Sequence, residues 1–420
     1  MLKKIEVADA RLGMHLHELC GTWLDHPFWK TRFLLRATDD LAKLKASGVA
    51  QCWIDTSKGL DVAQTPAHAV LVPPPVVGMA VAAQPLASPA APLRETTSME
   101  EELRRAAALF QQSRQAVQSL LNEARMGHAV DAQSCLPLVS DIADSVWRNS
   151  GALVSLARLK THDDYSYMHS VAVCALMVTL ARQLGHSEEL AREAGLAGLL
   201  HDIGKAMMPL EVLNKPGKLT ETEYKVIQCH PLRGHQLLSD SAGVGPLALD
   251  VCLHHHERPD GKGYPHALAG DALSQAARMG ALCDVYDAIT SNRPYKGGWD
   301  PAESVSKMAE WTGAGQFDSG VFQTFVKSLG IYPNGSLVRM HSGRLAVVVE
   351  QNPQTLVSPR VKVFFSTQGR APIPPEVLDL SHSACTDRIA ARESNSEWKF
   401  EHLDELWAGA DNLHTIGHSA

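Results

Sequence analysis

Apolar residues recur at helical spacing through almost the whole of residues 160–330, and this pattern limits the fold more than any other feature of the chain. Apolar positions that return every three to four residues place their side chains on one face of a helix. The segments with such stripes are 168–184, 188–201, 220–238, 245–256, 273–291, 301–312 and 319–329. Glycine and proline gather between them, as expected of loops. The pattern predicts an all-helical bundle.

The rest of the chain divides by composition. Residues 1–64 alternate short apolar runs with turn residues, which predicts a small β-rich N-terminal regulatory module. Residues 65–97 are rich in proline and alanine and are expected to form an extended linker. The helical domain, with two long leading helices, is placed at 98–330. Residues 331–366 alternate like short strands of a β appendage, and 367–420 show few periodic signals, which predicts a C-terminal tail. The expected fold class is therefore mainly α.

Charge and composition exclude some classes of partner and location. The formal net charge is -7, so no overall positive field attracts nucleic acid or an anionic membrane. There is no uninterrupted apolar run of about 18 residues, the length that membrane insertion needs. No signal-peptide core follows Lys3 and Lys4, so a cytoplasmic location is expected. The 8 cysteines are scattered without C-x-x-C spacing, which is typical of thiols in a reducing compartment.

Histidines and carboxylates cluster within the helical region. Taken singly, His169, His230 and Asp284 are each more often ordinary core or surface residues than ligands. His201 and Asp202 are adjacent, and neighbouring residues of a helix point about 100° apart, so this pair converges only for a special reason. A metal ion supplies that reason. The full candidate set is His169, His201, Asp202, His230, His255, His256 and Asp284.

These side chains together indicate a centre with two metals. Imidazole nitrogens with carboxylate oxygens suit divalent iron or manganese, with nickel, cobalt and zinc as further candidates. The seven residues are too many for one tetrahedral site, and Asp202 is the best carboxylate to bridge two ions. Two ions about 3.5–4 Å apart acidify a bridging water and stabilise the attacking and leaving oxygens at phosphorus. Hydrolysis of a phosphoester is the expected reaction.

Several ordered motifs carry a family resemblance. Residues 201–205 read His-Asp-Ile-Gly-Lys, and residues 255–257 read His-His-Glu, followed by Asp-Gly-x-Gly-Tyr-Pro at 260–265. Further matching segments are 215–220, 230–234, 284–288 and 293–296. Together they resemble HD-GYP domains, a branch of the HD phosphohydrolase superfamily, across roughly residues 160–330. The N-terminal module, with Gly13-Met14 and an aromatic string at 23–28, resembles the uncharacterised domain that often precedes HD-GYP domains.

The resemblance implies a phosphodiesterase that opens cyclic di-GMP to pGpG and, in some members, continues to GMP, which lowers the level of this bacterial second messenger. It implies one ion among His169, His201, Asp202 and Asp284, and a second among Asp202, His230, His255 and His256. A hydroxide that bridges the metals would be the nucleophile. Asp202 and Lys205 would be the catalytic residues. Lys205, Arg293 and Lys296 would bind phosphate, and Tyr264 would shape the substrate site.

One departure concerns the number of metals. Some family members carry a glutamate four residues before the first histidine ligand, where it supports a third metal, and this chain has Tyr165 there. A neutral phenol, with a pKa of about 10, is a poor ligand for a divalent metal. Two metals are therefore expected, with a slower or incomplete second hydrolysis to GMP.

Other functions remain open at this point. The main alternative is a non-hydrolytic sensor or scaffold that binds cyclic di-GMP, or that binds a diguanylate cyclase through the Gly-Tyr-Pro turn at 263–265. A third option is an HD hydrolase that acts on another nucleotide. The sequence leaves homodimer formation, the native metal and the input signal undecided.

Overall fold

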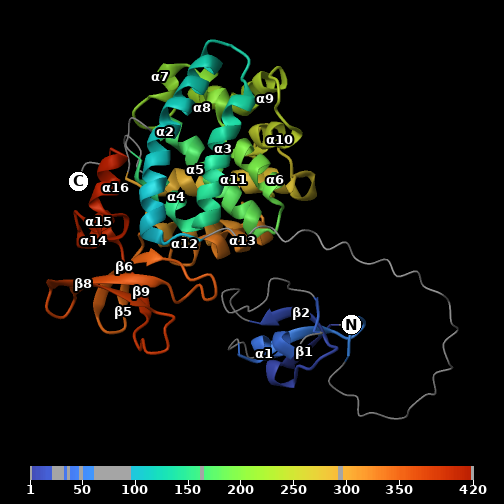
Figure 1. Ribbon diagram of the computed structural model, residues 1–420. Coiled ribbons are helices and arrows are strands. Elements are labelled where there is room, and N and C mark those ends of the chain that lie inside the picture. The colour runs from blue at the N-terminus through green and yellow to red at the C-terminus, as the bar shows by residue number, and fades with distance from the viewer. Residues whose placement is uncertain are drawn as a thin grey trace, which may run out of the picture. The chain divides into compact units, whose positions relative to one another are not determined.

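The computed structural model describes residues 2–20, 33–35, 38–46, 51–60, 96–160, 165–291 and 297–417 (Figure 1). The chain forms two compact units, residues 1–90 and 91–420, and each is described by itself. The aromatic string at 23–28, almost all of the linker, Arg293 and Lys296 lie outside the described residues.

The N-terminal unit contains a four-stranded antiparallel sheet with the order β1-β4-β2-β3. Its strands are β1 (Leu2–Glu6), β2 (His15–Cys20), β3 (Phe33–Leu34) and β4 (Gln51–Asp55). The helix α1 (Thr38–Ala46) contributes Leu44 to a small apolar core with Met14, Leu16 and Ile54. The expected β-rich module is therefore present.

Two long helices open the second unit, as expected. In α2 (Met99–Arg125) the Ser98 side chain caps the N-terminus by accepting a hydrogen bond from the Glu101 N–H. The helix α3 (Ala132–Arg148) follows, then the short helix α4 (Ser150–Leu156). The fully buried Glu102 carboxylate accepts two hydrogen bonds from Arg148, at 2.7 and 2.8 Å, and so joins α2 to the end of α3.

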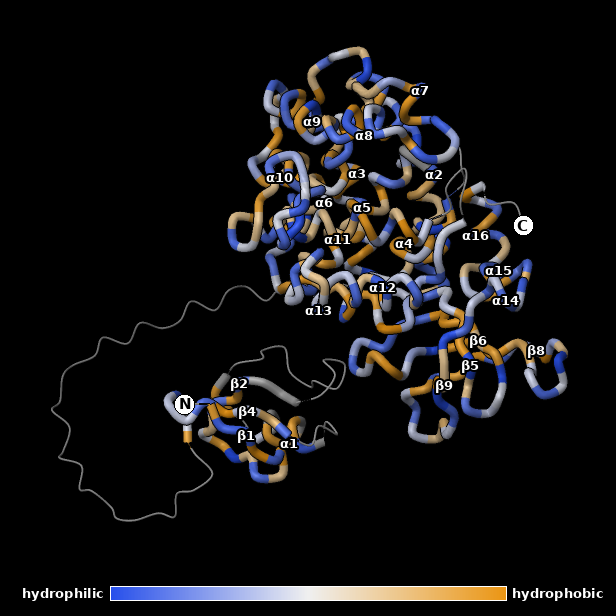
Figure 2. Tube along the Cα trace, turned by 180° about the vertical axis from the view of Figure 1, so that it is seen from behind, coloured by the Kyte–Doolittle hydropathy of each residue, from blue (hydrophilic) through white to orange (hydrophobic). Residues whose placement is uncertain are grey.

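The centre of this unit is the pair α5 (Tyr165–Gln183) and α6 (Glu188–Leu200). Every residue from 168 to 181 in α5 is buried, which explains why this helix is apolar on all sides rather than along one stripe. Gly198 lets the two helices approach closely, because a Cβ there would lie 2.9 Å from the Val173 carbonyl oxygen. Figure 2 shows hydrophobic residues concentrated along these central helices.

The remaining helices surround that pair. They are α7 (Leu210–Leu213), α8 (Glu221–Ile227), α9 (His230–Ser239), α10 (Pro246–His254), α11 (Gln275–Thr290), α12 (Pro301–Gly313) and α13 (Ser319–Leu329). The expectation of a single helix at 220–238 was wrong, because this stretch forms two helices, α8 and α9. Pro231 explains the break, since proline lacks an N–H and favours the first turn of a new helix. None of the described helices is both long enough and apolar enough to span a bilayer.

The C-terminal part forms a five-stranded antiparallel sheet with the order β8-β7-β6-β5-β9. Its strands are β5 (Leu337–Met340), β6 (Arg344–Glu350), β7 (Arg360–Ser366), β8 (Ala371–Asp379) and β9 (Ile389–Arg392). In Figure 1 the sheet lies at the end of the helical domain where α12 and α13 are found. Together with the helical bundle and the N-terminal sheet, it confirms the expected fold class.

The stretch expected to be a tail is ordered instead. It contains β8, β9 and the helices α14 (Asn395–Trp398), α15 (Leu403–Ala408) and α16 (Ala410–Thr415), and α16 packs against α2. The strand β8 was not predicted, because most of its residues are exposed and so do not alternate between apolar and polar. It also contains Pro372, Pro374 and Pro375, and prolines are tolerated within a sheet only on edge strands such as this one.

Candidate metal centre

Five segments of the second unit place the seven expected ligand residues. His169 lies on α5, and Asp284 lies on α11. The other residues lie at helix ends: His201 and Asp202 follow α6, His230 begins α9, and His255 and His256 follow α10. All are buried except His256, whose side chain is 22% exposed.

Two glycines bring the Asp202 turn against α9. A short 3-10 helix (Ile203–Met207) follows Asp202, and a Cβ on Gly204 would lie 2.0 Å from the His230 carbonyl oxygen. A Cβ on Gly234 would lie 3.0 Å from the backbone nitrogen of Gly204. The two backbones therefore touch directly, which holds Asp202 next to His230 and explains the glycines in both motifs.

The first ligand group contains His169, His201, Asp202 and Asp284, whose ligand atoms all lie within 4.8 Å of one another. His169 Nε2 lies 3.0 Å from Asp284 Oδ1 and 3.4 Å from Asp202 Oδ2. His201 Nε2 lies 3.3 Å from the same oxygen of Asp202. Two imidazoles and two carboxylates thus converge on one point.

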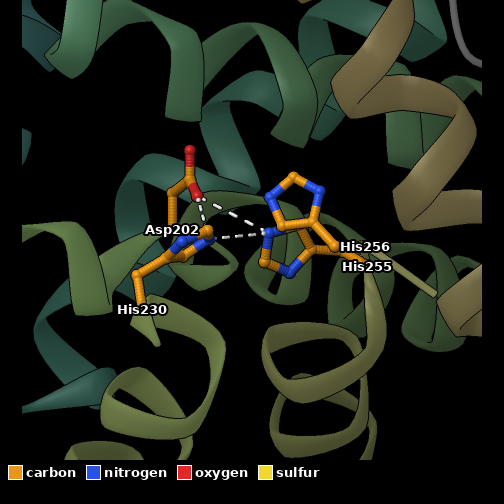
Figure 3. A group of neighbouring side chains, drawn as sticks. All are labelled: Asp202, His230, His255 and His256. Atoms are coloured by element: carbon orange, nitrogen blue, oxygen red, sulfur yellow. Dashed lines mark hydrogen bonds and ion pairs between the residues drawn. The ribbon is translucent and has the colours of Figure 1, made fainter. Parts of the chain in front are cut away.

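The second ligand group contains Asp202, His230, His255 and His256, which satisfy the same limit of 4.8 Å (Figure 3). Asp202 Oδ1 lies 3.1 Å from His230 Nε2 and 3.6 Å from His255 Nε2. Asp202 belongs to both groups, with Oδ2 directed to the first and Oδ1 to the second. This is the arrangement expected of a bridging carboxylate.

Backbone carbonyls fix the direction of three of the imidazoles. The Nδ1–H groups of His201 and His230 donate to Gly198 and Ile227, each at 2.8 Å, and His255 donates to Cys252 at 3.0 Å. Each Nε2 is left to face the centre. Such outer contacts set the tautomer of histidines that bind metals.

Two buried atoms at the centre support a metal. Among the described residues, His201 Nε2 and Asp202 Oδ1 are buried without a hydrogen-bond partner. Buried polar atoms almost always have a partner, and a divalent ion bound among these ligand groups would provide one for each atom. The atoms lie in different groups, and the donor set of nitrogen and oxygen fits divalent metal ions.

The charges in the centre are strongly coupled. Burial alone would lower the pKa of His169, but its hydrogen bonds to Asp202, Asp284 and Asp287 outweigh burial and raise the pKa to about 10. Burial lowers the pKa of His255 to about 4. Burial would raise the pKa of Asp202, but the charges of Lys205 and His201 hold it well below its usual range. The bridging carboxylate is therefore ionised and available to cations.

Sequence reasoning missed two residues behind the first group. Asp287 Oδ2 accepts a hydrogen bond from His169 Nδ1 at 2.6 Å and so directs Nε2 of that ring to the centre. The fully buried Lys160 donates to both oxygens of Asp287 at 2.7 Å. Asp287 stands in the matched segment at 284–288 and was a visible candidate. Nothing in the sequence around Lys160 indicated that this lysine would be buried.

The residues expected to contact substrate are placed in part. Lys205 donates to Asp202 Oδ2, and its side chain is 37% exposed, so its ammonium lies at the edge of the centre. The Tyr264 ring stacks on His256 with centroids 4.7 Å apart. The side chain of Tyr165, like Arg293 and Lys296, is not part of the described structure.

The loop that carries Tyr264 is fastened by a buried carboxylate. Glu257 accepts hydrogen bonds from the backbone N–H groups of His266 and Leu268, at 2.6 and 3.1 Å. Gly263 passes so close that a Cβ there would lie 2.4 Å from the Glu257 Cα. The glycine of the Gly-Tyr-Pro turn is thus required for packing, and the turn holds Tyr264 against the second ligand group.

The chain is similar in sequence to known proteins and families. Residues 140–321 match a family described as HD domain, and residues 2–135 match a domain of unknown function (DUF3391). A cyclic di-GMP phosphodiesterase of Pseudomonas aeruginosa is 53% identical over 97% of this chain and 96% of its own length. A cyclic di-GMP phosphodiesterase response regulator of Xanthomonas campestris pv. campestris is 50% identical over 29% of this chain and 32% of its own. A 3'3'-cGAMP-specific phosphodiesterase of Vibrio cholerae serotype O1 is 38% identical over 39% and 38%, respectively.

Proposed function

Because the chain belongs to the HD-domain cyclic di-GMP phosphodiesterases, we propose that it opens cyclic di-GMP to the linear dinucleotide pGpG at the centre around Asp202. The observation that carries this proposal is the shared position of Asp202 in two complete ligand groups. A full set of buried nitrogen and oxygen donors favours an enzyme over the alternative of a non-hydrolytic sensor or scaffold, which has no need to keep every ligand.

The seven ligand side chains would hold two divalent ions. When bound, such ions lower the pKa of a coordinated water and stabilise charge on the attacking and leaving oxygens of a phosphoester. Mixed imidazole and carboxylate donors favour iron or manganese, with nickel, cobalt and zinc as the other candidates. With Tyr165 in place of a glutamate, two ions per chain are proposed, and hydrolysis beyond pGpG to GMP is expected to be slow or incomplete.

The protein's own groups bind and orient the substrate. Asp202 holds the ammonium of Lys205 at the edge of the centre, where this cation can pair with a phosphate oxygen. Arg293 and Lys296 are proposed as further contacts to the two phosphates. Tyr264 covers one face of His256 and presents its other face as part of the wall for a nucleotide base.

A product analysis tests the proposal. The purified protein, reconstituted with Fe(II) or Mn(II), is incubated with cyclic di-GMP, and the products are separated by chromatography. Metal-dependent formation of pGpG is expected. Asp202→Ala should abolish it, whereas Asp240→Ala, which removes an exposed carboxylate at the end of α9, should not. Absence of turnover under every metal loading would favour the sensor.

A parallel reaction with 3'3'-cGAMP tests the substrate. One relative is named as specific for that dinucleotide. We expect the present protein to cleave cyclic di-GMP faster than 3'3'-cGAMP. Preferential cleavage of 3'3'-cGAMP would overturn the choice of substrate but not the proposed reaction.

Location and partners are further parts of the proposal. The cysteines from Cys52 to Cys385, whose side chains the structure describes, are free thiols, which supports a reducing, cytoplasmic compartment. Binding of a diguanylate cyclase through the turn at 263–265, and formation of a homodimer, stay predictions.

A further inference from the structure

A cavity lies between the helical bundle and the C-terminal sheet. It encloses about 370 Å³, within the range of about 300–1,000 Å³ usual for small-molecule sites. The ends of α3, α5 and α13 form its walls, together with the start of α4 and the loops around residues 334 and 352. None of the seven ligand residues of the metal centre lines it.

Positive side chains dominate the ionic groups of this cavity. Arg148, Arg158, Arg182 and Lys327 line it, against one carboxylate, Glu350. Two of these charges are already balanced, because Arg148 pairs with Glu102, and Glu350 pairs with Arg360 at 2.6 Å. Arg158 and Arg182 alone therefore leave an excess of positive charge in the lining.

The two remaining arginines contact neutral groups. Arg158 is buried, donates to the Asn334 carbonyl and lies over the Trp407 ring at 5.7 Å. Arg182 Nη1 donates to the Val146 carbonyl at 2.9 Å. Within the described residues neither guanidinium lies within ion-pair distance of a carboxylate, but Asp300 acts electrostatically on Arg158, and Glu188 acts on Arg182. Each contact uses a fraction of the five N–H donors of the guanidinium, so donors remain for an anion.

The other walls suit an organic molecule rather than a bare ion. Met99, Trp147 and Leu329 supply apolar surface, and Asn149 and Gln183 supply amide groups. Ligand sites typically combine such apolar walls with a few polar groups that fix orientation. A phosphate with an attached ring system matches both the charge and the lining, and the volume is at the small end of the usual range.

Two residues that line the cavity are close in sequence to residues behind the first ligand group. Tyr286 lines the cavity and precedes Asp287, which orients His169. Arg158 also lines it and lies two residues before Lys160, the partner of Asp287. The cavity lining is therefore joined through the backbone to both members of the ion pair that holds His169.

We propose that this cavity binds a small organic phosphate of mononucleotide size and that its occupancy changes the metal affinity of the first ligand group. The binding part stands independently of the catalytic activity. The regulatory part rests on the proposed function, because it assumes that the first ligand group holds a catalytic ion.

Calorimetry with GMP as the probe tests binding. The starting protein is full-length Lys205→Gln, in which nucleotide binding at the metal centre is expected to be weaker. Arg182→Gln or Lys327→Gln is then added to it, and each removes one charge from the cavity. GMP affinity at the cavity is expected to fall about tenfold for each, the loss of one charge-assisted contact, and guanosine should bind far more weakly than GMP. Arg105→Gln is the matched control, because this exposed arginine of α2 pairs with Glu101 and does not line the cavity.

Two cavity variants keep the test decisive if one of them folds poorly, which far-UV circular dichroism will reveal. GMP binding that neither cavity variant weakens belongs to the metal centre and overturns the proposal. No binding of GMP at all also overturns it, and does so whether or not cyclic di-GMP is hydrolysed.

A Mn(II) titration of the otherwise wild-type protein tests the coupling. GMP at the lowest concentration that fills the cavity of the wild-type protein is expected to change the affinity for Mn(II) by about fivefold or more, the lower range for coupled sites. At that concentration the Arg182→Gln cavity is mostly empty, so this change should be much smaller, which separates coupling from direct contact between GMP and the metal. An equal shift in both proteins would refute the coupling.

Discussion

The two ligand groups of the metal centre share Asp202 but differ in the charge around them. The first contains two carboxylates and two imidazoles, and the second contains one carboxylate and three imidazoles. Asp287, behind His169 of the first group, adds no net charge, because Lys160 pairs with it. The additional ligand carboxylate, Asp284, makes the first group the more negative, so it should bind a divalent cation more tightly.

The groups also differ in what orients their histidines. In the second group, backbone carbonyls orient His230 and His255. In the first, a carboxylate orients His169, and the buried Lys160 balances its charge. The pKa values follow this difference, with His169 raised to about 10 by its carboxylate partners and His255 lowered to about 4 by burial. His169 is thus oriented by a carboxylate, whereas His201 of the same group is oriented by a backbone carbonyl, as are His230 and His255 of the second group.

Asp202→Asn is the change with the largest expected effect, because it removes the charge that both groups share. We expect the metal content to fall below one ion per chain and turnover to fall by about a thousandfold or more, from the loss of several kcal/mol of transition-state stabilisation. Mass spectrometry of the metals and product chromatography measure these effects. His230→Ala, which damages the second group alone, should retain one ion. Two retained ions in Asp202→Asn would show that the groups are independent.

Lys160→Met should affect the first group alone. It leaves the Asp287 carboxylate buried without its cation, and breaking such a pair costs about 3–5 kcal/mol of unfolding free energy. Asp287, the outer contact of His169, loses the cation that positions it, and this should weaken binding of the tighter ion by about 10–100-fold. Urea unfolding and Mn(II) titration measure the two effects.

The matched control for Lys160→Met is Lys218→Met, at an exposed lysine of the loop before α8, which should change neither quantity. Equal weakening of both ions by Lys160→Met would show that its effect is a general loss of structure rather than a property of the first group.

Tyr264→Ala should have the smallest effect and should act on the second group alone. The stack on His256 is worth about 0.5–1.5 kcal/mol, so binding of the weaker ion should fall by a few-fold up to about tenfold. Tyr264→Phe keeps the ring and is the control, with an affinity close to that of the wild type. If Tyr264→Phe weakens the ion as much as Tyr264→Ala, the hydroxyl rather than the stack is responsible. Mn(II) titration distinguishes the two outcomes.

The sequence predicted most of the helices because their patterns are strong and local. Helical stripes and capping residues such as Ser98, Ser187 and Ser274 mark their ends. The missed features depend on tertiary context. The split between α8 and α9 lies within a continuous stripe, and the exposed edge strand β8 lacks the alternation of buried and exposed residues that marks a strand.

The ligand groups could be predicted because their histidines and aspartates lie in several motifs that follow one another in a fixed order along the sequence. The residues behind them could not. Lys160 lies 127 positions from Asp287, and burial of a lysine depends on a partner that only the folded chain supplies. The charged cavity was hidden for the same reason, because its lining comes from distant segments at 96–99, 147–158 and 327–356.

The claim that one carboxylate links two metal ions is tested most directly by electron paramagnetic resonance of the protein loaded with two equivalents of Mn(II). A bridge by Asp202 predicts the broad spectrum of an exchange-coupled manganese pair, and this coupling should disappear in Asp202→Asn. The six-line spectrum of isolated Mn(II) ions in the fully loaded wild-type protein would contradict the account.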